Sequence, residues 1–315
     1  MTGKRYKPIT ITDSFYQLGT PSFPAYLSVG EKAMIIEGGT GATTSIILDQ
    51  IKELGIEPER ITYLVLTHTH ADHIGAVPHL KKLWPHLKIA AHPLAIKLLK
   101  NERTVREFIE NDKGIIQIML SKGEIQSYPP ELDHYEFHVD DAIEEGDKLD
   151  LGAGIVWTVY NTPGHSSCHI SLFEEQEKTL VIGDATGFYV PEKDVFWPNY
   201  FESLEAYCKS IRKLATLPAH RAALSHNGVI EGNVGEFFHK AMKTAEHYHY
   251  EMIARLEKGE DPADIAIDKA NWVNSLTDIQ TFEVMRRLAK VLISRSHSEA
   301  GKENMFSIPR MISCR

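Results

Sequence analysis

Three histidines and one aspartate lie within the six consecutive residues from His68 to His73. They form the pattern His-x-His-x-Asp-His, and the apolar run 63–66 directly before them is typical of a buried strand. Packing does not explain so many ligand-type side chains at the end of one strand. Imidazole nitrogen and carboxylate oxygen together suit zinc, iron or manganese. The pattern therefore predicts that this loop binds metal.

Three further ligand-type residues follow predicted strands, namely His165, Asp184 and His226. These strands are expected at 155–160, 179–182 and 222–224. Loops after different strands can converge at one edge of an open α/β fold, so the side chains can meet there. Five histidines and two aspartates in such loops can supply two metal ions. His220 is an alternative to His226, but it precedes its strand instead of following it.

The elements around these loops alternate between strand and helix patterns. A strand pair is expected at 25–29 and 33–37, followed by a helix at 43–54, a strand at 63–66 and a helix at 75–83. This alternation predicts an α/β domain. The glycine cluster 38–41 lacks the known phosphate-binding spacings, and we interpret it as a turn.

Two regions favour helices only. We expect a helical insertion at about 93–128, which could form a lid or one wall of a cleft, or be a decoration without a role. A helical extension is expected at 231–296. The prediction is thus a catalytic domain over 1–230, this extension, and a disordered tail over 297–315.

The segment 188–201 is rich in aromatic residues and proline. We expect an irregular loop that lines an apolar pocket. Tyr189, Phe196 and Trp197 are predicted to contact an apolar or aromatic acyl group, and ordinary core packing is the alternative.

Composition excludes several classes of function. The net charge is −9 without a basic stripe, which gives no support to nucleic-acid binding. The three cysteines form no pair of the kind found in disulfide frameworks or metal knuckles, which favours the cytoplasm. We also expect no signal peptide and no membrane span. Cys168 lies near His165 in sequence but shows no nucleophile pattern.

With these motifs in place, the chain resembles the metallo-β-lactamase superfamily. The resemblance rests on the pattern at 68–73, on Thr-Pro-Gly-His ending at His165, on Gly-Asp at 183–184, and on Ser-His-Asn-Gly at 225–228. It implies a four-layer αββα sandwich, to which the helical insertion and the C-terminal helices are added. It also implies two divalent metal ions, either zinc or iron, with manganese as a third choice.

The resemblance further implies how the ligands divide. One metal would be bound by His68, His70 and His165. The second would be bound by Asp72, His73 and His226, with Asp184 bridging the two ions. Asp72 and Asp184 are the predicted catalytic carboxylates, and Asp72 would also orient a hydroxide held between the metals.

Within the superfamily, the stretches 183–197 and 201–207, together with the helical insertion and the C-terminal helices, look most similar to thioesterase-like members such as the 2-aminobenzoylacetyl-CoA thioesterases of the quinolone-signal response. The glyoxalase II-like hydrolases share the metal motifs. The expected reaction is hydrolysis of a small-molecule thioester or ester, such as an acyl-CoA or a glutathione thioester. A thiol, with a pKa of about 8.5, leaves more readily than an alcohol, which favours thioesters. We also expect a homodimer formed through the helical regions.

Three other functions stay open. A phosphodiesterase or nuclease of the same fold would use the same two metals. A mononuclear iron dioxygenase would need fewer ligands, and the intact set of Asp72, His73 and His226 argues against it. A signalling effector would act mainly by binding a partner, with its helical surface as the interface.

Overall fold

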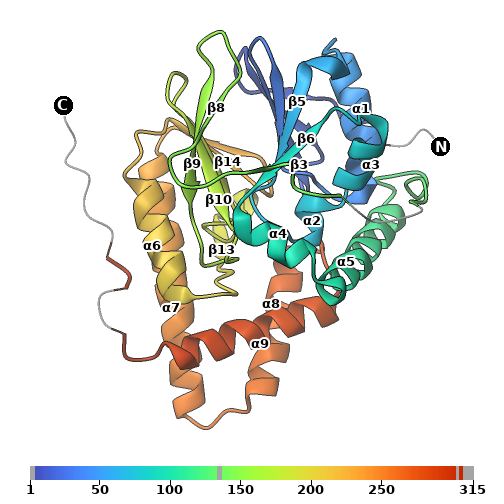
Figure 1. Cartoon of the computed structure of the whole chain (residues 1–315). Coiled ribbons are helices and arrows are strands. Elements are labelled where there is room, and N and C mark those ends of the chain that lie inside the picture. Colours follow the sequence, from blue (N-terminus) through green and yellow to red (C-terminus); the bar gives the residue numbers. More distant parts are fainter. Residues whose placement is uncertain (1–3, 133–136, 303–304, 308–315) are drawn as a thin grey trace.

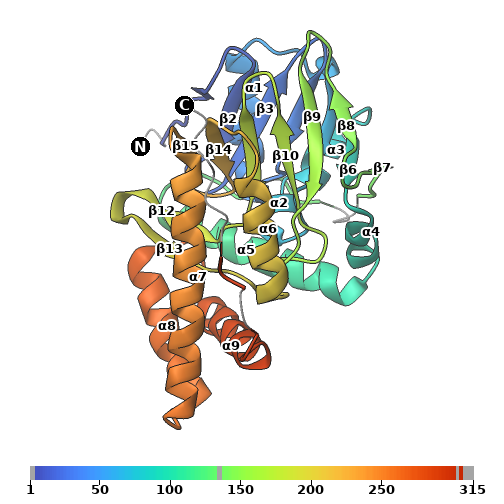
Figure 2. The ribbon, with the colours of Figure 1, turned by 90° about the vertical axis from the view of Figure 1, so that its left-hand side faces the viewer.

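The computed structural model describes residues 4–132, 137–302 and 305–307, and two β-sheets packed face to face form its centre (Figures 1 and 2). Within these residues, seven strands form the first sheet in the order β1 to β7, and six strands form the second in the order β15-β14-β11-β10-β9-β8. The first sheet comprises β1 (Ile9–Thr10), β2 (Phe15–Gly19), β3 (Pro24–Val29), β4 (Ala33–Ile36), β5 (Ile61–Val65), β6 (Lys88–Ala91) and β7 (Asp141–Ala142). The second comprises β8 (Lys148–Asp150), β9 (Val156–Asn161), β10 (Ile170–Glu174), β11 (Thr179–Gly183), β14 (Arg221–Leu224) and β15 (Val229–Glu231).

Helices cover the outer face of each sheet, which gives the expected four-layer αββα sandwich (Figures 1 and 2). Helices α1 (Thr44–Glu53) and α3 (Val77–Leu83) pack against the first sheet, and α6 (Leu204–Ala215) and α7 (Val234–Glu257) against the second. Short 3-10 turns lie at Gly41–Thr43, Pro58–Arg60 and Pro191–Lys193.

The central strands are buried on both faces, which explains their continuous apolar sequences. Side chains alternate along a strand, so Ile35 and Leu64 point to the outer helices while Met34, Ile36 and Val65 point to the second sheet. Burying an aliphatic side chain of this size stabilises the fold by roughly 1.5–3 kcal/mol. The strands of the first sheet therefore pack against the outer helices on one face and against the second sheet on the other.

Parallel strand pairs place the functional loops at one edge. Strand β5 runs parallel to β4 and β6, and β11 runs parallel to β14. The loops that follow parallel neighbours leave the sheet at the same end. The chain after β5, β11 and β14 is therefore brought to one side of the sandwich.

Helices dominate the insertion and the C-terminal part of the chain. Helices α4 (Pro93–Leu99) and α5 (Glu102–Ser121) lie in the expected insertion, and α5 begins after Asn101, whose side chain accepts from the backbone of Arg103 and Thr104. Helices α8 (Pro262–Leu276) and α9 (Phe282–Ser298) follow α7, and α9 crosses below the sandwich towards α5 (Figure 1). None of the described helices combines the length and apolar character needed to cross a membrane.

The predicted disordered tail falls partly on residues 303–304 and 308–315, which lie outside the described residues. In the described part, α9 extends to Ser298 and the side chain of Met305 is buried against the helices. The division into domains stays a prediction.

The prediction of an irregular loop at 188–201 is wrong. Strands β12 (Phe188–Val190) and β13 (Val195–Trp197) form an antiparallel hairpin within this segment. Each strand has only three residues, which is too short to show an alternating pattern, and the turn carries Asp194 in the left-handed region at φ 50°. The hairpin packs into the core that the second sheet shares with α6 and α7.

Candidate metal centre

The predicted ligands converge at the edge where the loops leave the two sheets. His68 and His70 follow β5, and the short helix α2 (Ala71–Ile74) then presents Asp72 and His73. His165 follows β9, Asp184 follows β11, and His226 follows β14. The convergence of parallel strand ends thus assembles residues that are far apart in sequence.

Three imidazoles form the first group. His68 Nε2 lies 3.1 Å from His70 Nδ1, and His165 Nε2 lies 3.2 Å and 2.9 Å from these two atoms. Two nitrogen ligands of one tetrahedral ion, each about 2.0–2.1 Å from it, stand roughly 3.4 Å apart. The observed spacing is close to that value, so His68, His70 and His165 fit one ion.

The second group combines two imidazoles with a carboxylate. Asp72 Oδ2 lies 3.6 Å from His73 Nε2 and 3.5 Å from His226 Nε2. Each of the three residues can offer one atom to a common point. His226 therefore takes the position for which His220 was the alternative, and His220 is exposed before β14.

Asp184 lies between the two groups. Its Oδ2 atom is 3.3 Å from His165 Nε2 and 3.7 Å from His73 Nε2, while Oδ1 is 3.8 Å from His226 Nε2. One carboxylate can therefore face ions in both positions.

The first group holds neutral imidazoles. Burial lowers the pKa of His70 to about 3 and the pKa of His165 to about 4, and it also lowers the pKa of His68. Neutral imidazoles keep a free lone pair, which is the form that binds metal.

The second group favours a positive charge. Burial lowers the pKa of His73, but the carboxylates of Asp72, Glu37 and Asp184 outweigh it and raise the pKa to about 10. The Nε2 atom of His73 is buried without a hydrogen-bond partner among the described residues. A buried nitrogen without a partner is costly. A cation that binds its lone pair beside these carboxylates would take the place of the proton and supply the positive charge that they favour. The residues present thus fit a second ion.

Glu37 supports this group, and it was not among the site residues predicted from the sequence. The residue follows β4 in the left-handed region at φ 75°, and its side chain is buried. Its Oε2 atom lies 2.8 Å from His73 Nδ1, while Oε1 accepts hydrogen bonds from Thr67 and Ser225, each at 2.7 Å. Carboxylates in this position orient metal-binding histidines. The available signal was an acidic residue directly after an apolar strand.

His169 and Asn199 are two more residues that sequence reasoning did not find. The ring of His169 accepts a hydrogen bond from the backbone N–H of Asp184 at 2.9 Å. The carbonyl of Asn199 lies 2.9 Å from His165 Nδ1, and its amide Nδ2 lies 3.5 Å from Asp184 Oδ2. Both residues thus fix the orientation of ligands. The backbone contact of Asn199 has no sequence signal.

A cavity of about 280 Å³ opens onto this centre. Its floor includes the candidate ligands His70, Asp72, His165, Asp184 and His226. Its walls are mostly apolar and come from the hairpin, from α5 and from the C-terminal helices. They include Phe108, Phe188, Trp197, Phe201, Ile279, Val284, Met285 and Leu288. This combination of an apolar wall and a polar floor is typical of a small-molecule site.

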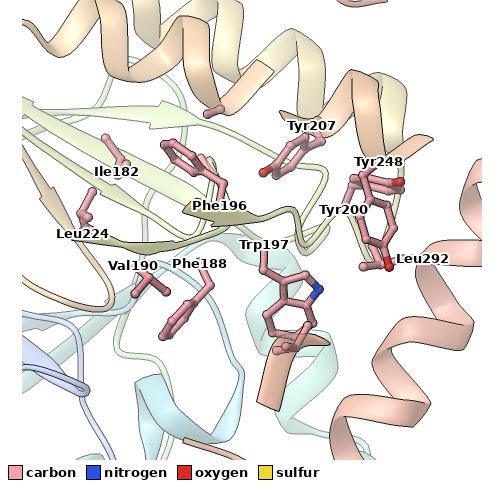
Figure 3. Close-up of a cluster of buried hydrophobic side chains, with 14 of the residues drawn as sticks. Ile182, Phe188, Val190, Phe196, Trp197, Tyr200, Tyr207, Leu224, Tyr248 and Leu292 are labelled. Atoms are coloured by element: carbon pink, nitrogen blue, oxygen red, sulfur yellow. The ribbon is translucent and has the colours of Figure 1, made fainter. Parts of the chain in front are cut away.

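Of the three aromatic residues predicted to contact substrate, Trp197 lines this cavity, whereas Tyr189 and Phe196 do not. The register of the hairpin is the reason, because Phe188 is opposite Trp197 and Tyr189 is opposite Phe196. Each pair shares one face. Figure 3 shows Phe188 and Trp197 on the side opposite Phe196, whose ring packs 5.0 Å from that of Phe237 on α7.

Cys168 is buried in the core of the first sheet and does not line the cavity. Its sulfur lies 3.3 Å from the hydroxyl of Ser166 and 3.7 Å from that of Thr69. It therefore contributes packing near the centre.

Solved structures of low sequence identity share this fold. A metallo-β-lactamase family protein of Thermus thermophilus is similar with a TM-score of 0.61 and 21% identity, covering 91% of this chain and 94% of that one. An archaeal metallo-β-lactamase superfamily protein of Sulfolobus tokodaii gives 0.56 and 20%, covering 91% and 99%.

Sequence relatives agree with the fold. The probable metallo-hydrolase YflN of Bacillus subtilis is 27% identical over 204 residues, which are 61% of this chain and 74% of that protein. An atrochrysone carboxyl ACP thioesterase of Aspergillus fumigatus is 26% identical over 65% of this chain, which spans half the length of that protein. The sequence profile of the metallo-β-lactamase superfamily matches residues 23–226, which hold every predicted ligand, and this chain belongs to that superfamily.

Proposed function

We propose that this protein is a metal-dependent hydrolase that cleaves a thioester, or an ester, of a small acyl group. The observation that carries the proposal is the pair of ligand groups joined by Asp184 at the floor of an apolar cavity. Two divalent ions bound there would activate water and polarise a carbonyl group. The ligand types suit zinc, iron and manganese alike.

The residues of the chain have distinct tasks in such a reaction. Asp72 Oδ2 lies beside His73 and His226 and lines the cavity, so it can accept a proton from attacking water. Phe188, Trp197 and Phe201 can bind an apolar acyl group and exclude bulk water from the reacting carbonyl. Among the described residues that line the cavity, Glu107 is the one acidic group besides the candidate ligands, and it is paired with Arg103. The lack of a dedicated acid at the ligands favours a thiol over an alcohol as the leaving group.

One of the relatives supports cleavage of a thioester, because it is a thioesterase by name. The alignment covers half of its length. Phosphodiester cleavage is the alternative within the same fold, and the mostly apolar walls next to the candidate ligands favour an acyl group over a phosphodiester.

The test combines metal analysis with substrates. We expect the purified protein to contain about two metal ions per chain and to hydrolyse acyl-CoA or acyl-glutathione faster than alkyl esters, lactones or bis(p-nitrophenyl) phosphate. Asp184→Asn should lower the metal content and reduce kcat by at least about 100-fold, because its carboxylate faces both groups. Full metal content together with full activity in this variant would refute the two-metal proposal.

A signalling effector that acts through partner binding makes the opposite prediction. Its cellular effect would survive Asp184→Asn as long as the variant folds, which circular dichroism and thermal unfolding can establish.

A further inference from the structure

The mouth of the cavity lies between two elements outside the sandwich. Helix α5 contributes Phe108 and Asn111 to the lining, and α9 contributes Val284, Arg287 and Leu288. The same cavity reaches the metal ligands at its floor. A substrate whose carbonyl reaches that floor must therefore pass between α5 and α9.

Two charged residues other than the metal ligands line this cavity. Glu107 is engaged by Arg103, whose Nε lies 3.2 Å from Glu107 Oε1. Arg287 is exposed, and its Nη2 lies 3.4 Å from Asn111 Oδ1. It forms no ion pair with the residues that the structure describes. Its guanidinium thus retains free donors at the mouth.

The neighbouring face of α9 is also basic. A hollow beside the mouth is lined by residues that share one face of α9 because they are three or four positions apart, namely Glu283, Arg286, Arg287 and Lys290. Arg286 pairs with Glu283 at 2.7 Å. Lys290 has no ion-pair partner in the described part of the chain. Two cations therefore remain available in a chain whose net charge is −9.

The size of the cavity determines which part of a substrate meets these cations. A volume of about 280 Å³ is at the small end for ligand pockets. Its apolar walls suit the acyl group, so the rest of a thioester must extend through the mouth. Biological carriers of thioesters bear phosphates or carboxylates on that part.

Resting on the proposed function, we propose that Arg287, together with Lys290, binds an anionic group of the carrier from which the acyl group is cleaved. The guanidinium can form paired hydrogen bonds with a phosphate or a carboxylate. This contact lies outside the reacting centre, so it determines carrier specificity and does not take part in bond cleavage.

The first experiment compares one acyl group on three carriers, namely coenzyme A, glutathione and the neutral N-acetylcysteamine. Arg287→Gln should raise KM about tenfold for the carrier whose anion it binds and change kcat less than twofold, with the neutral carrier unaffected. A loss with coenzyme A alone would identify phosphate, and a loss with glutathione alone would identify carboxylate. Lys243→Gln is the matched control, because Lys243 is exposed on α7 and lines none of the hollows described.

Equal effects of Arg287→Gln on charged and neutral carriers, or no effect on any, would overturn the inference. If the wild-type protein cleaved none of the three thioesters, the proposed function would fail. The role of Arg287 would then be tested separately, by measuring how tightly the protein binds the carriers alone. Isothermal titration with desulfo-coenzyme A and S-methylglutathione should show about tenfold weaker binding by Arg287→Gln. Unchanged binding, or no binding to the wild-type protein, would refute the role of Arg287.

Discussion

At the scale of single residues, the candidate metal centre depends on buried groups that are not themselves predicted ligands. Glu37 connects His73 with the hydroxyls of Thr67 and Ser225, which lie on loops after two different sheets. Its backbone is held at a positive φ, which is uncommon for a residue with a side chain and is typical of functional positions.

Replacing Glu37 by glutamine should weaken metal binding about 10- to 100-fold, because the amide removes the negative charge that holds His73. Competition with a chromophoric chelator measures this affinity. The exposed Glu59→Gln change removes the same charge far from the centre and should leave the affinity unchanged. Unaltered affinity in Glu37→Gln would show that His73 needs no such support.

The candidate ligands that the structure brings together could be located from the sequence, whereas the residues that hydrogen-bond to them could not. His68, His165 and Asp184 each follow a strand within a recognisable motif. The carbonyl of Asn199 acts through the backbone, so residue type carries no information about it. Glu37 could be noticed only as an acidic residue directly after the apolar strand β4.

At the scale of elements, short strands explain what the sequence could not show. Strands β4 and β5 have four and five mostly apolar residues, and these apolar runs allow the strands to be predicted. The hairpin of β12 and β13 has only three residues per strand, which is too short for such a pattern. Register within that hairpin decides which aromatic rings face the cavity, and register is set by pairing that a single sequence does not reveal.

Helix α5 is attached to the sandwich through a buried carboxylate. Asp112 accepts a hydrogen bond from the backbone N–H of Gly41 at 3.0 Å, next to the glycine-rich turn. A side chain on Gly75 would collide with Asp112, since an added Cβ would lie against its Oδ1. The insertion thus packs closely against α2, which carries two of the ligands.

This attachment predicts a pH dependence of stability. Burial raises the pKa of Asp112 from 3.8 to about 6, so the folded protein binds a proton that the unfolded chain has released. The stability that protonated Asp112 contributes to the folded protein is fully present below about pH 4, and it is lost as the pH rises through about 6. Relative to wild type, Asp112→Asn should therefore gain up to about 3 kcal/mol in free energy of unfolding between pH 4 and pH 7.

Urea unfolding across that range measures the difference. The exposed Asp13→Asn change serves as the control and should show no such trend. A difference between Asp112→Asn and wild type that stays constant with pH would contradict the raised pKa.

At the scale of the whole molecule, the C-terminal helices are joined to the catalytic layers by specific contacts. Arg295 Nε donates to the carbonyl of Phe201 at 2.9 Å, and Ser296 bonds the hydroxyl of Tyr200 at 2.8 Å. Glu299 accepts from the backbone N–H groups of Leu204 and Glu205 at the start of α6. The segment 199–205 is thereby fixed beside His165.

Arg295→Met should lower both the free energy of unfolding and the metal affinity. A hydrogen bond from a charged group contributes about 1.5–3 kcal/mol, and its loss frees the segment whose Asn199 carbonyl orients His165. Thermal unfolding and chelator competition measure the two effects. Arg5→Met removes an exposed ion pair with Glu53 and should change neither by more than a small amount. A loss of stability in Arg295→Met without a loss of metal affinity would show that α9 does not influence the candidate metal centre.

Helix α9 lines the mouth of the cavity at one end and holds the segment beside His165 at the other. If Arg287 and Lys290 bind the carrier as proposed, transplanting the C-terminal helices from a relative would change the carrier preference and also disturb the candidate metal ligands. We expect a chimera to retain metal binding only when residues 199–205 are transplanted with the helices. An engineer who wants to change the specificity of this chain would therefore have to exchange two separate segments together, residues 199–205 and the C-terminal helices.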